Sequence, residues 1–230
     1  MTQKLATLTS KENITIITLD DGKANVFSSA MIGDINDCLD RVPTDKGALI
    51  ITGREGILSG GFDLKIISSR DMKEIHKMTL SGFRLLSRIL SFPRPVIGVC
   101  TGHAIALGTF LLCCCDYRIG AKGDFMIGAN EMRTNMVIPI PILELIRFRV
   151  SQRHKYRAIL GAEMYSIEAS VDAGLMDQAI DQEKLMEMAF QKAEDLATMG
   201  HPSYSLTKEL FINDVAEKIN NSLDEINAAT

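Results

Sequence analysis

Two glycine-bearing segments contain the residue types in this sequence that could do chemistry. The first, residues 58–65, contains the pair Gly60-Gly61, and paired glycines permit a turn that leaves the following N–H groups pointing at a ligand. The second, residues 102–110, leads into an apolar run. A helix beginning near Leu107 would present unpaired N–H groups and the positive end of its dipole there. Each segment also fits an ordinary tight turn, so the residues alone leave both interpretations open.

Together, the two segments could direct two fixed N–H donors at one oxygen atom. A carbonyl becomes an oxyanion when its α-carbon loses a proton, and each preorganised donor contributes about a hundred- to thousand-fold in rate. The remaining requirement is a carboxylate beside that carbon, for which Glu131 is the candidate. Glu131 suits a surface or helix-capping position as well. The pattern therefore indicates an enolate-forming enzyme only if the three groups meet.

Other catalytic signatures fail at their key positions. Gly56 and Gly61 have the spacing of a phosphate-binding P-loop, but Phe62-Asp63 stands where Lys-Ser/Thr is required. The sequence contains no G-x-S-x-G motif for a serine nucleophile. Its four histidines have no carboxylate or second histidine at ligand spacing, so we expect no metal site.

The composition is that of a globular protein with a substantial core. The chain has 230 residues, of which 46% are hydrophobic and 23% charged, and its net charge is −4. This charge argues against nucleic acid as the main partner, and no uninterrupted apolar run reaches the roughly 18 residues that a membrane span needs. The five cysteines include the run Cys113-Cys114-Cys115, without a secretory signal before them. We therefore expect reduced, buried thiols in a cytoplasmic protein.

The elements that must position these groups alternate between strands and helices. Apolar runs predict strands at residues 14–19, 48–52 and 95–99. Helices between them would begin at Ser28 or Ser29 and at Asp71, and such crossovers imply a largely parallel sheet. The second half predicts short strands at 117–119 and 174–180 and helices around 185–196 and 219–226. We expect one α/β core followed by a helical C-terminal third.

With these motifs in place, the sequence resembles the crotonase (enoyl-CoA hydratase/isomerase) superfamily from about Ile14 to Lys208. Each motif is weak alone, but their order and spacing are specific. The motifs are Lys23-Ala24-Asn25, Ser59 to Lys65, Pro95 to Gly98 leading into Gly102-His103-Ala104, Asp116 to Ile119, Asn130-Glu131, and Ala173 to Met176. The resemblance implies an α/β fold in which ββα units form a spiral over residues 1–175. A shortened helical trimerisation region would occupy residues 176–230.

The resemblance also implies roles for individual residues. The N–H groups of Phe62 and Leu107 would form an oxyanion hole, with Glu131 as the general acid/base. Substrates would be acyl-CoA thioesters, coenzyme A being part of the substrate rather than a cofactor, and the protein would form a homotrimer or a dimer of trimers. The residues expected to bind substrate are Lys23, Ala24, Gly60, Gly61, Phe62, Asp63, Leu64, Lys65, Leu107, Gly108 and Phe110. Lys23 and Lys65 are the expected phosphate partners, although Lys65 also suits a solvated surface position.

One departure from the family pattern bears on the reaction. Family hydratases use two glutamates, whereas here the first position is Phe110 and only the second is kept, as Glu131. Paired carboxylates suit the addition of water, while a single carboxylate can move a proton between C2 and C4, and an apolar Phe110 would exclude water. The pattern favours Δ3-Δ2 enoyl-CoA isomerisation. Hydration of 2-enoyl-CoA and non-catalytic acyl-CoA binding are the alternatives.

Further departures concern the shape of the site and the end of the chain. Ala106-Leu107 stands where a glycine pair is usual, which predicts a tighter pocket floor. Residues 132–135 replace a more apolar stretch, which would reshape the acyl tunnel. The resemblance implies final helices that can cover a neighbouring subunit's CoA, and we expect these helices to be shortened or missing before Thr230.

Overall fold

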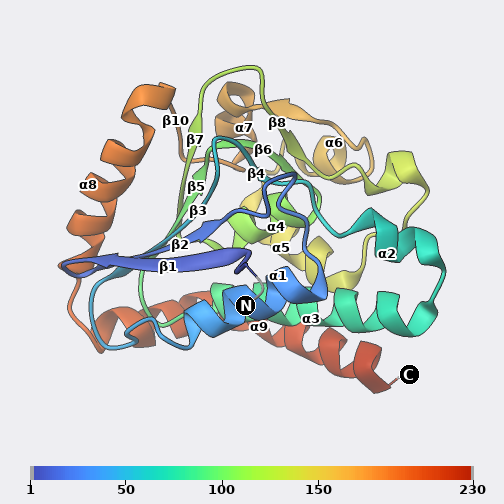
Figure 1. Cartoon of the computed structure of the whole chain (residues 1–230), viewed down its shortest axis with the longest axis horizontal. Helices are drawn as coiled ribbons and strands as arrows, with labels where there is room; N and C mark the ends of the chain where they lie inside the picture. Colours follow the sequence, from blue (N-terminus) through green and yellow to red (C-terminus); the bar gives the residue numbers. More distant parts are fainter. Residues whose placement is uncertain (1–2, 229–230) are drawn as a thin grey trace.

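The computed structural model describes residues 3–228 and contains two β-sheets flanked by helices (Figure 1). The larger sheet has the strand order β1-β2-β3-β5-β7-β10, formed by Ala6–Lys11, Ile14–Leu19, Ala48–Gly53, Val96–Cys100, Tyr117–Ala121 and Gln178–Ile180. β1 and β2 pair antiparallel, and the other neighbours in this sheet are parallel. The smaller sheet has the order β4-β6-β8-β9, formed by Gly56–Ser59, Gly102–Ile105, Met126–Gly128 and Tyr165–Ser166.

Most of the helices connect these strands. They are α1 (Ser29–Leu39), α2 (Leu64–Ser69), α3 (Met72–Leu90), α4 (Leu107–Cys114), α5 (Ile140–Arg149), α6 (Lys155–Ile159), α7 (Ile167–Ala173), α8 (Leu185–Ala197) and α9 (Ser203–Ala228), with short 3-10 helices at Glu131–Thr134 and Gln182–Lys184. The chain repeats one step: a strand of the large sheet, a strand of the small sheet, then a helix. This step occurs at β3-β4-α2, β5-β6-α4 and β7-β8-α5. The expected ββα architecture is confirmed.

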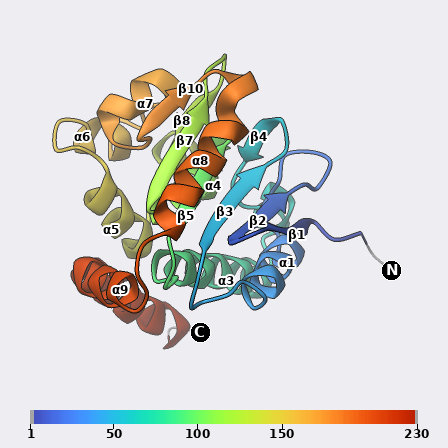
Figure 2. The same ribbon diagram turned by 90° about the vertical axis from the view of Figure 1, so that its left-hand side faces the viewer.

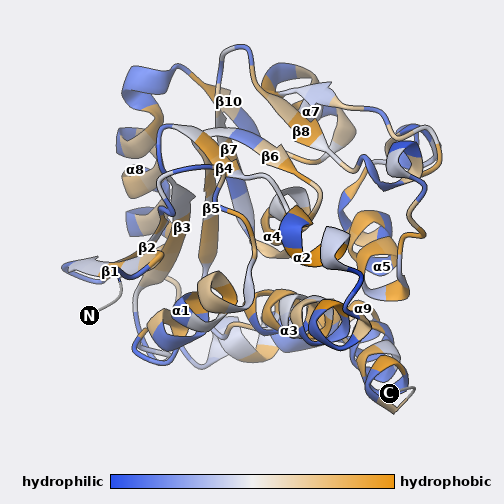
Figure 3. Cartoon of the chain, turned by 45° about the vertical axis from the view of Figure 1, so that its right-hand side comes forward, coloured by the Kyte–Doolittle hydropathy of each residue, from blue (hydrophilic) through white to orange (hydrophobic). Residues whose placement is uncertain are grey.

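The large sheet separates two apolar cores. On one face, α8 lies across the strands (Figure 2) and buries Leu185 and Ala189 against a cluster that includes Ile50 and Val99. The other face carries the larger core, and Figure 3 shows the hydrophobic character of β5 and α5. α9 packs against α3 and α5. All six residues of β3 are buried, as expected for a parallel strand covered on both faces.

The strands and caps expected in the first half are confirmed. β2, β3 and β5 coincide with the three predicted apolar runs to within one residue. The side chain of Ser28 accepts a hydrogen bond from the Met31 N–H at the start of α1, and Asp71 accepts from the N–H groups of Lys73 and Glu74 at the start of α3. These caps satisfy N–H groups that have no partner inside the helix.

The strand predicted over residues 174–180 is wrong in its first half. Gly174 ends α7 with φ = +81°, and its N–H bonds back to the carbonyls of Ser170 and Val171. Only Gln178–Ile180 pair with β7. Leu175 and Met176 are buried in the connecting turn, so their apolar character reflects core packing and not strand pairing.

The cysteine side chains are in the state that the sequence predicts. All five cysteines are free and buried, and burial raises the pKa of the thiols of Cys100 and Cys115 to about 12. Such thiols stay protonated and inert at neutral pH. Over residues 3–228, no helix is both long enough and apolar enough to cross a bilayer.

Candidate active site

The parallel pairing of three short strands brings the predicted site segments together. β4 pairs in parallel with β6, and β6 in parallel with β8. Parallel strands share the edge at which they end, and ligand sites of α/β proteins form at such edges. The loops that follow these strands begin at Gly60, Ala106 and Ala129. The loops with Phe62, Leu107 and Glu131 therefore emerge side by side, although they are separated by many residues in the sequence.

These loops enclose a cavity of about 340 Å³ with mostly apolar walls. Six of the predicted site residues line it: Gly60, Phe62, Leu64, Leu107, Phe110 and Glu131. The walls also include Ile67, Thr79, Phe83, Ile105, Ala106, Asn130, Thr134, Met136, Val137, Pro139 and Ile142. Of the described residues around this cavity, Glu131 is the only one with a titratable side chain.

The Phe62 N–H belongs to a peptide group that is anchored on its opposite side. The Gly61 carbonyl accepts a hydrogen bond from the Phe27 N–H at 2.8 Å. In a trans peptide the C=O and N–H point in opposite directions, so this bond turns the Phe62 N–H away from Phe27. Within residues 3–228 the Phe62 N–H has no hydrogen-bond partner. Gly61 has φ = +92°, and a Cβ placed on it would lie 3.6 Å from the Leu107 nitrogen, so the two loops are in contact.

The Leu107 N–H is the first of helix α4 and points out of its N-terminus. The Ala106 carbonyl accepts from the Phe110 N–H at 3.1 Å, as in the first turn of a helix, whereas the Leu107 N–H has no acceptor in the described chain. Ala106 holds φ = +51° and ψ = −118°, a conformation that suits glycine and costs another residue about 1–3 kcal/mol. Its N–H bonds to the Gly128 carbonyl at 2.9 Å, which ties this strained turn to β8.

Glu131 brings a carboxyl group into the cavity with one of its oxygens left unpaired among the described residues. Its Oε2 atom is buried and has no hydrogen-bond partner among the described residues. Burial raises the pKa of Glu131, and a hydrogen bond from its own backbone N–H offsets this only in part. A raised pKa makes a carboxyl group a better proton acceptor in its ionised form and a usable donor afterwards.

Phe110 occupies the wall of the cavity next to the unpaired amides. It follows Leu107 by three residues in α4, so the two side chains lie on neighbouring positions of the helix. Phe110 is 2% exposed. Its ring therefore presents hydrocarbon to this part of the cavity. Gly108, which the resemblance placed among the binding residues, packs against the main chain of Ser59 and does not line the cavity, since a Cβ on it would lie 2.7 Å from the Ser59 carbonyl oxygen.

Other predicted binding residues lie outside the cavity lining. Lys23 and Lys65 are exposed. The Ala24 carbonyl accepts a hydrogen bond from the Gly60 N–H at 2.8 Å, which joins the two segments that carry these lysines. Asp63 caps α2 by accepting from the Lys65 N–H. Only Leu64 of residues 63–65 reaches the cavity.

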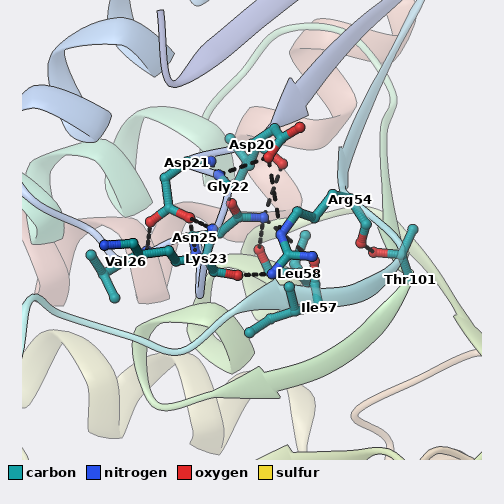
Figure 4. A network of polar contacts seen from close by, with 11 residues as sticks. Asp20, Asp21, Gly22, Lys23, Asn25, Val26, Arg54, Ile57, Leu58 and Thr101 are labelled. Carbon is teal, nitrogen blue, oxygen red and sulfur yellow. Dashed lines mark hydrogen bonds and ion pairs between the residues drawn. The ribbon is translucent and has the colours of Figure 1, made fainter. Parts of the chain in front are cut away.

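A buried asparagine, for which the sequence predicted no role, holds the segment 20–26 beside the site (Figure 4). Asn25 is fully buried, and its side-chain amide donates to the carbonyls of Leu19 and Leu58 at 2.9 and 3.2 Å. The main-chain carbonyl of Asn25 accepts a hydrogen bond from the Ser59 hydroxyl at 2.6 Å, and that hydroxyl accepts one from the Gly61 N–H at 3.1 Å. The chain of bonds therefore runs from segment 20–26 to the Gly60–Gly61 peptide group, which adjoins the one that carries the Phe62 N–H.

The side chain of Asp21 also holds the main chain of segment 20–26 in place. The Asp21 carboxylate accepts from the N–H groups of Asn25, Lys23 and Val26 (Figure 4). Burial alone would raise the pKa of Asp21, but these three hydrogen bonds and the charge of Arg54 hold it below its usual value. Arg54 also donates to the Lys23 carbonyl. The main chain around Lys23 and Ala24 is thus fixed before any ligand binds.

The arrangement can hold an oxyanion and move a proton. It offers two unpaired N–H groups from touching loops, one carboxyl group of raised pKa, and apolar walls that strengthen these interactions. As for metals, the described part of the chain contains no group of three or more His, Cys, Asp or Glu side chains placed to hold one.

Comparisons with known proteins identify the family of the chain. Residues 9–227 match the enoyl-CoA hydratase/isomerase family. A probable enoyl-CoA hydratase of Bacillus subtilis is 28% identical over 207 residues, covering 88% of this chain and 80% of that protein. The solved structure of a probable enoyl-CoA hydratase from Mycobacterium tuberculosis has a TM-score of 0.92 and 35% identity, covering 98% of this chain and 95% of that one.

A second solved structure of that same Mycobacterium tuberculosis protein carries the isomerase name. The apo structure of an enoyl-CoA isomerase from Mycobacterium tuberculosis has a TM-score of 0.91 and 34% identity, covering 99% of both chains. The family match over nearly the whole sequence and the likeness in fold lead to one conclusion: the chain belongs to the enoyl-CoA hydratase/isomerase family.

Proposed function

We propose that this enzyme is a Δ3-Δ2 enoyl-CoA isomerase in which Glu131 is the general acid/base. The observation that carries the proposal is that Glu131 is the only titratable side chain among the described residues of the cavity wall, which also contains Phe110. The family resemblance implies that hydratases have their other glutamate at the position of Phe110. One carboxyl group can take a proton and return it. Addition of water calls for activating the water as well as delivering a proton.

The proposed reaction consists of two proton transfers on one acyl chain. The ionised Glu131 carboxylate takes a proton from C2 of the 3-enoyl thioester, and the electron pair of that C–H bond delocalises over C2–C4 and the thioester oxygen. The N–H groups of Phe62 and Leu107 bind the resulting oxyanion. The protonated Glu131 then delivers the proton to C4, which leaves the double bond between C2 and C3. Atoms and charge balance, and the carboxylate is regenerated.

The coenzyme A portion would bind outside the cavity along segment 20–26 and residues 63–65. Lys23 and Lys65 are the proposed phosphate partners, because both are exposed and their segments are joined by the hydrogen bond between Gly60 and Ala24. Neither a separate cofactor nor a metal enters the proposed reaction. The homotrimer or dimer of trimers and the cytoplasmic location stay predictions.

Assays with two substrates separate the candidate functions. Purified protein is incubated with 3-enoyl-CoA and, separately, with 2-enoyl-CoA, and the products are resolved by chromatography. Conversion of 3-enoyl-CoA to 2-enoyl-CoA supports isomerisation. Formation of 3-hydroxyacyl-CoA as the main product would make the protein a hydratase instead, and binding of both thioesters without turnover would make it a non-catalytic member of the family.

Phe110→Glu tests the account of the missing second acid. The substitution places a carboxyl group one helical turn from Leu107 in the cavity wall. We expect hydration of 2-enoyl-CoA to rise at least about tenfold above the wild-type level, because general acid–base assistance typically contributes 10²–10⁴-fold. Phe110→Gln is the control, since it admits water but cannot transfer a proton. Equal hydration by the two variants would contradict the account.

Ser59→Ala tests whether the hydrogen bonds behind the Phe62 amide matter for turnover. The variant leaves the Gly61 N–H and the Asn25 carbonyl without their buried partner. We expect a loss of about 1–3 kcal/mol in the free energy of unfolding and about a tenfold fall in kcat, because small displacements of catalytic groups are costly. Ser28→Ala removes the cap of α1 and should lower stability alone. Wild-type turnover by Ser59→Ala would show that this tether is dispensable.

A further inference from the structure

The 3-10 turn that carries Glu131 has little packing of its own. None of the residues of Glu131–Thr134 is buried as a whole. Beyond it, Asn135 adopts a left-handed conformation with φ = +56°, and Val137 is 90% exposed. The bonds from the Arg133 N–H to the Asn130 carbonyl and from the Met136 N–H to the Glu131 carbonyl stay inside the turn. Such a segment needs an external contact to keep a carboxyl group in one position.

Arg133 supplies that contact. Its Nε donates to the carbonyl oxygen of Ala162 at 2.9 Å. Over residues 3–228, this is the only hydrogen bond that joins residues 130–136 to another part of the chain. Arg133 belongs to the stretch 132–135, where the sequence departs from the pattern of the family that it resembles.

The acceptor end of the contact is fixed by its surroundings. Ala162 is 2% exposed and holds φ = +44° in the turn between α6 and β9. The Glu163 N–H bonds to the Arg157 carbonyl at 3.0 Å, and the two side chains form an ion pair with two hydrogen bonds. A Cβ on Gly128 would lie 2.9 Å from the Glu163 carbonyl oxygen, so this turn packs against the end of β8. The anchor therefore belongs to the same strand edge as the cavity.

We propose that Arg133 is a positioning residue that keeps the Glu131 carboxyl group in the cavity by fastening its turn to the Ala162 carbonyl. The inference rests on the proposed function, because it assigns Arg133 a part in proton transfer by Glu131. Arg133 acts through geometry and not through its charge. Its guanidinium nitrogen is bonded to a carbonyl in the α6–β9 turn, and no charged side chain other than Glu131 lines the described cavity wall.

Two variants separate the hydrogen bond from the bulk of the side chain. Arg133→Met keeps most of the aliphatic stem but has no donor, and Arg133→Lys keeps a cationic donor. Without the donor, we expect the turn to move and the Glu131 carboxyl group to become more exposed to water. We expect kcat for isomerisation to fall about 10- to 100-fold in Arg133→Met, with partial recovery in Arg133→Lys. Arg41→Met, at an exposed arginine after α1, is the control and should keep wild-type turnover.

The titration of Glu131 is the readout that a purely structural role would not move. Carbon-13 NMR of the labelled Glu131 carboxyl group, in the protein without substrate, should give a lower pKa in Arg133→Met than in the wild type, because burial is the main cause of the raised value. The acid limb of the kcat/KM profile should shift to lower pH in parallel.

The outcomes distinguish this inference from the proposed function. Unchanged kcat and unchanged titration in Arg133→Met would overturn the positioning role. Absence of isomerase activity in the wild type would overturn the proposed function, while the NMR titration would still test the tether. If Arg133→Met does not fold, Arg133→Ala is measured in its place: a fall in kcat together with a lowered pKa of Glu131 supports the role, and wild-type values of both overturn it.

Discussion

Glu131→Gln is expected to lower kcat by about 10²–10⁴-fold while making the folded protein more stable at neutral pH. The amide cannot accept the substrate proton, so the proposed transfer between C2 and C4 loses its only acid/base group. The gain in stability arises because the Glu131 Oε2 is buried without a partner, and an ionised carboxylate in that position is unfavourable. A lower kcat together with a higher free energy of unfolding would indicate that Glu131 serves catalysis at a cost in stability.

The pH dependence gives this prediction a definite sign. Burial raises the pKa of Glu131, so the folded protein binds this proton more tightly than the unfolded chain does. The stabilisation is fully present below the unfolded pKa, about 4.3, and is lost as the pH rises through the folded pKa. Because Glu131→Gln lacks this proton, the stability of the variant relative to wild type should increase with pH over that range.

Urea unfolding at a series of pH values between about 4 and 8 measures the difference directly. Glu194→Gln, at an exposed glutamate on α8, is the control and should track the wild type at every pH. A Glu131→Gln variant that keeps wild-type turnover would rule out Glu131 as the acid/base. A difference in stability that does not change with pH would rule out the raised pKa.

Gly61→Ala is expected to lower kcat/KM for 3-enoyl-CoA by about 10²–10³-fold, the cost of losing one oxyanion donor. Gly61 holds φ = +92°, which disfavours any side chain. A Cβ there would lie 3.0 Å from the Ala106 Cβ and 3.2 Å from the Ile105 carbonyl oxygen. The substitution therefore pushes apart the two loops whose N–H groups must meet at one oxygen.

A second glycine separates backbone strain from damage to the site. Gly56 has φ = +82°, and a Cβ on it would find no atom within 4 Å. It starts β4, at the end of the strand away from the site loops, so Gly56→Ala should lose stability through its backbone conformation alone and keep normal turnover. Steady-state kinetics and thermal unfolding of the two variants make the comparison. Equal kinetics for both would mean that contact between the loops is not needed.

The parts of the fold that could be predicted are those in which one residue pattern covers a whole element. β2, β3 and β5 are continuous apolar runs, and α1 and α3 carry both a cap and an apolar stripe. β8 has three residues and β9 has two, too few for any periodicity to appear. The small sheet that gathers the site loops was therefore not foreseen from the residues.

The candidate site was foreseen only with the family resemblance. Without the resemblance, the segments 58–65 and 102–110 could equally be tight turns, and Glu131 could be a surface or capping residue. Nothing in their spacing requires the three to lie close together. Asn25, Ser59 and Arg133 had no predicted role because each acts on a backbone carbonyl distant in sequence. Such a bond leaves no local pattern, and only the folded chain shows which carbonyl lies within reach.

The proposed oxyanion donors are main-chain groups, and this has a consequence for how such a site can diverge. Replacement of the side chain at 62 or 107 reshapes the cavity wall but leaves the amide hydrogen in place, provided that the Gly61 carbonyl keeps its bond to Phe27 and α4 still starts at its present residue. Substrate preference and catalytic activity can therefore evolve independently. Related enzymes could acquire new acyl specificities at these two positions without rebuilding the machinery that stabilises the enolate.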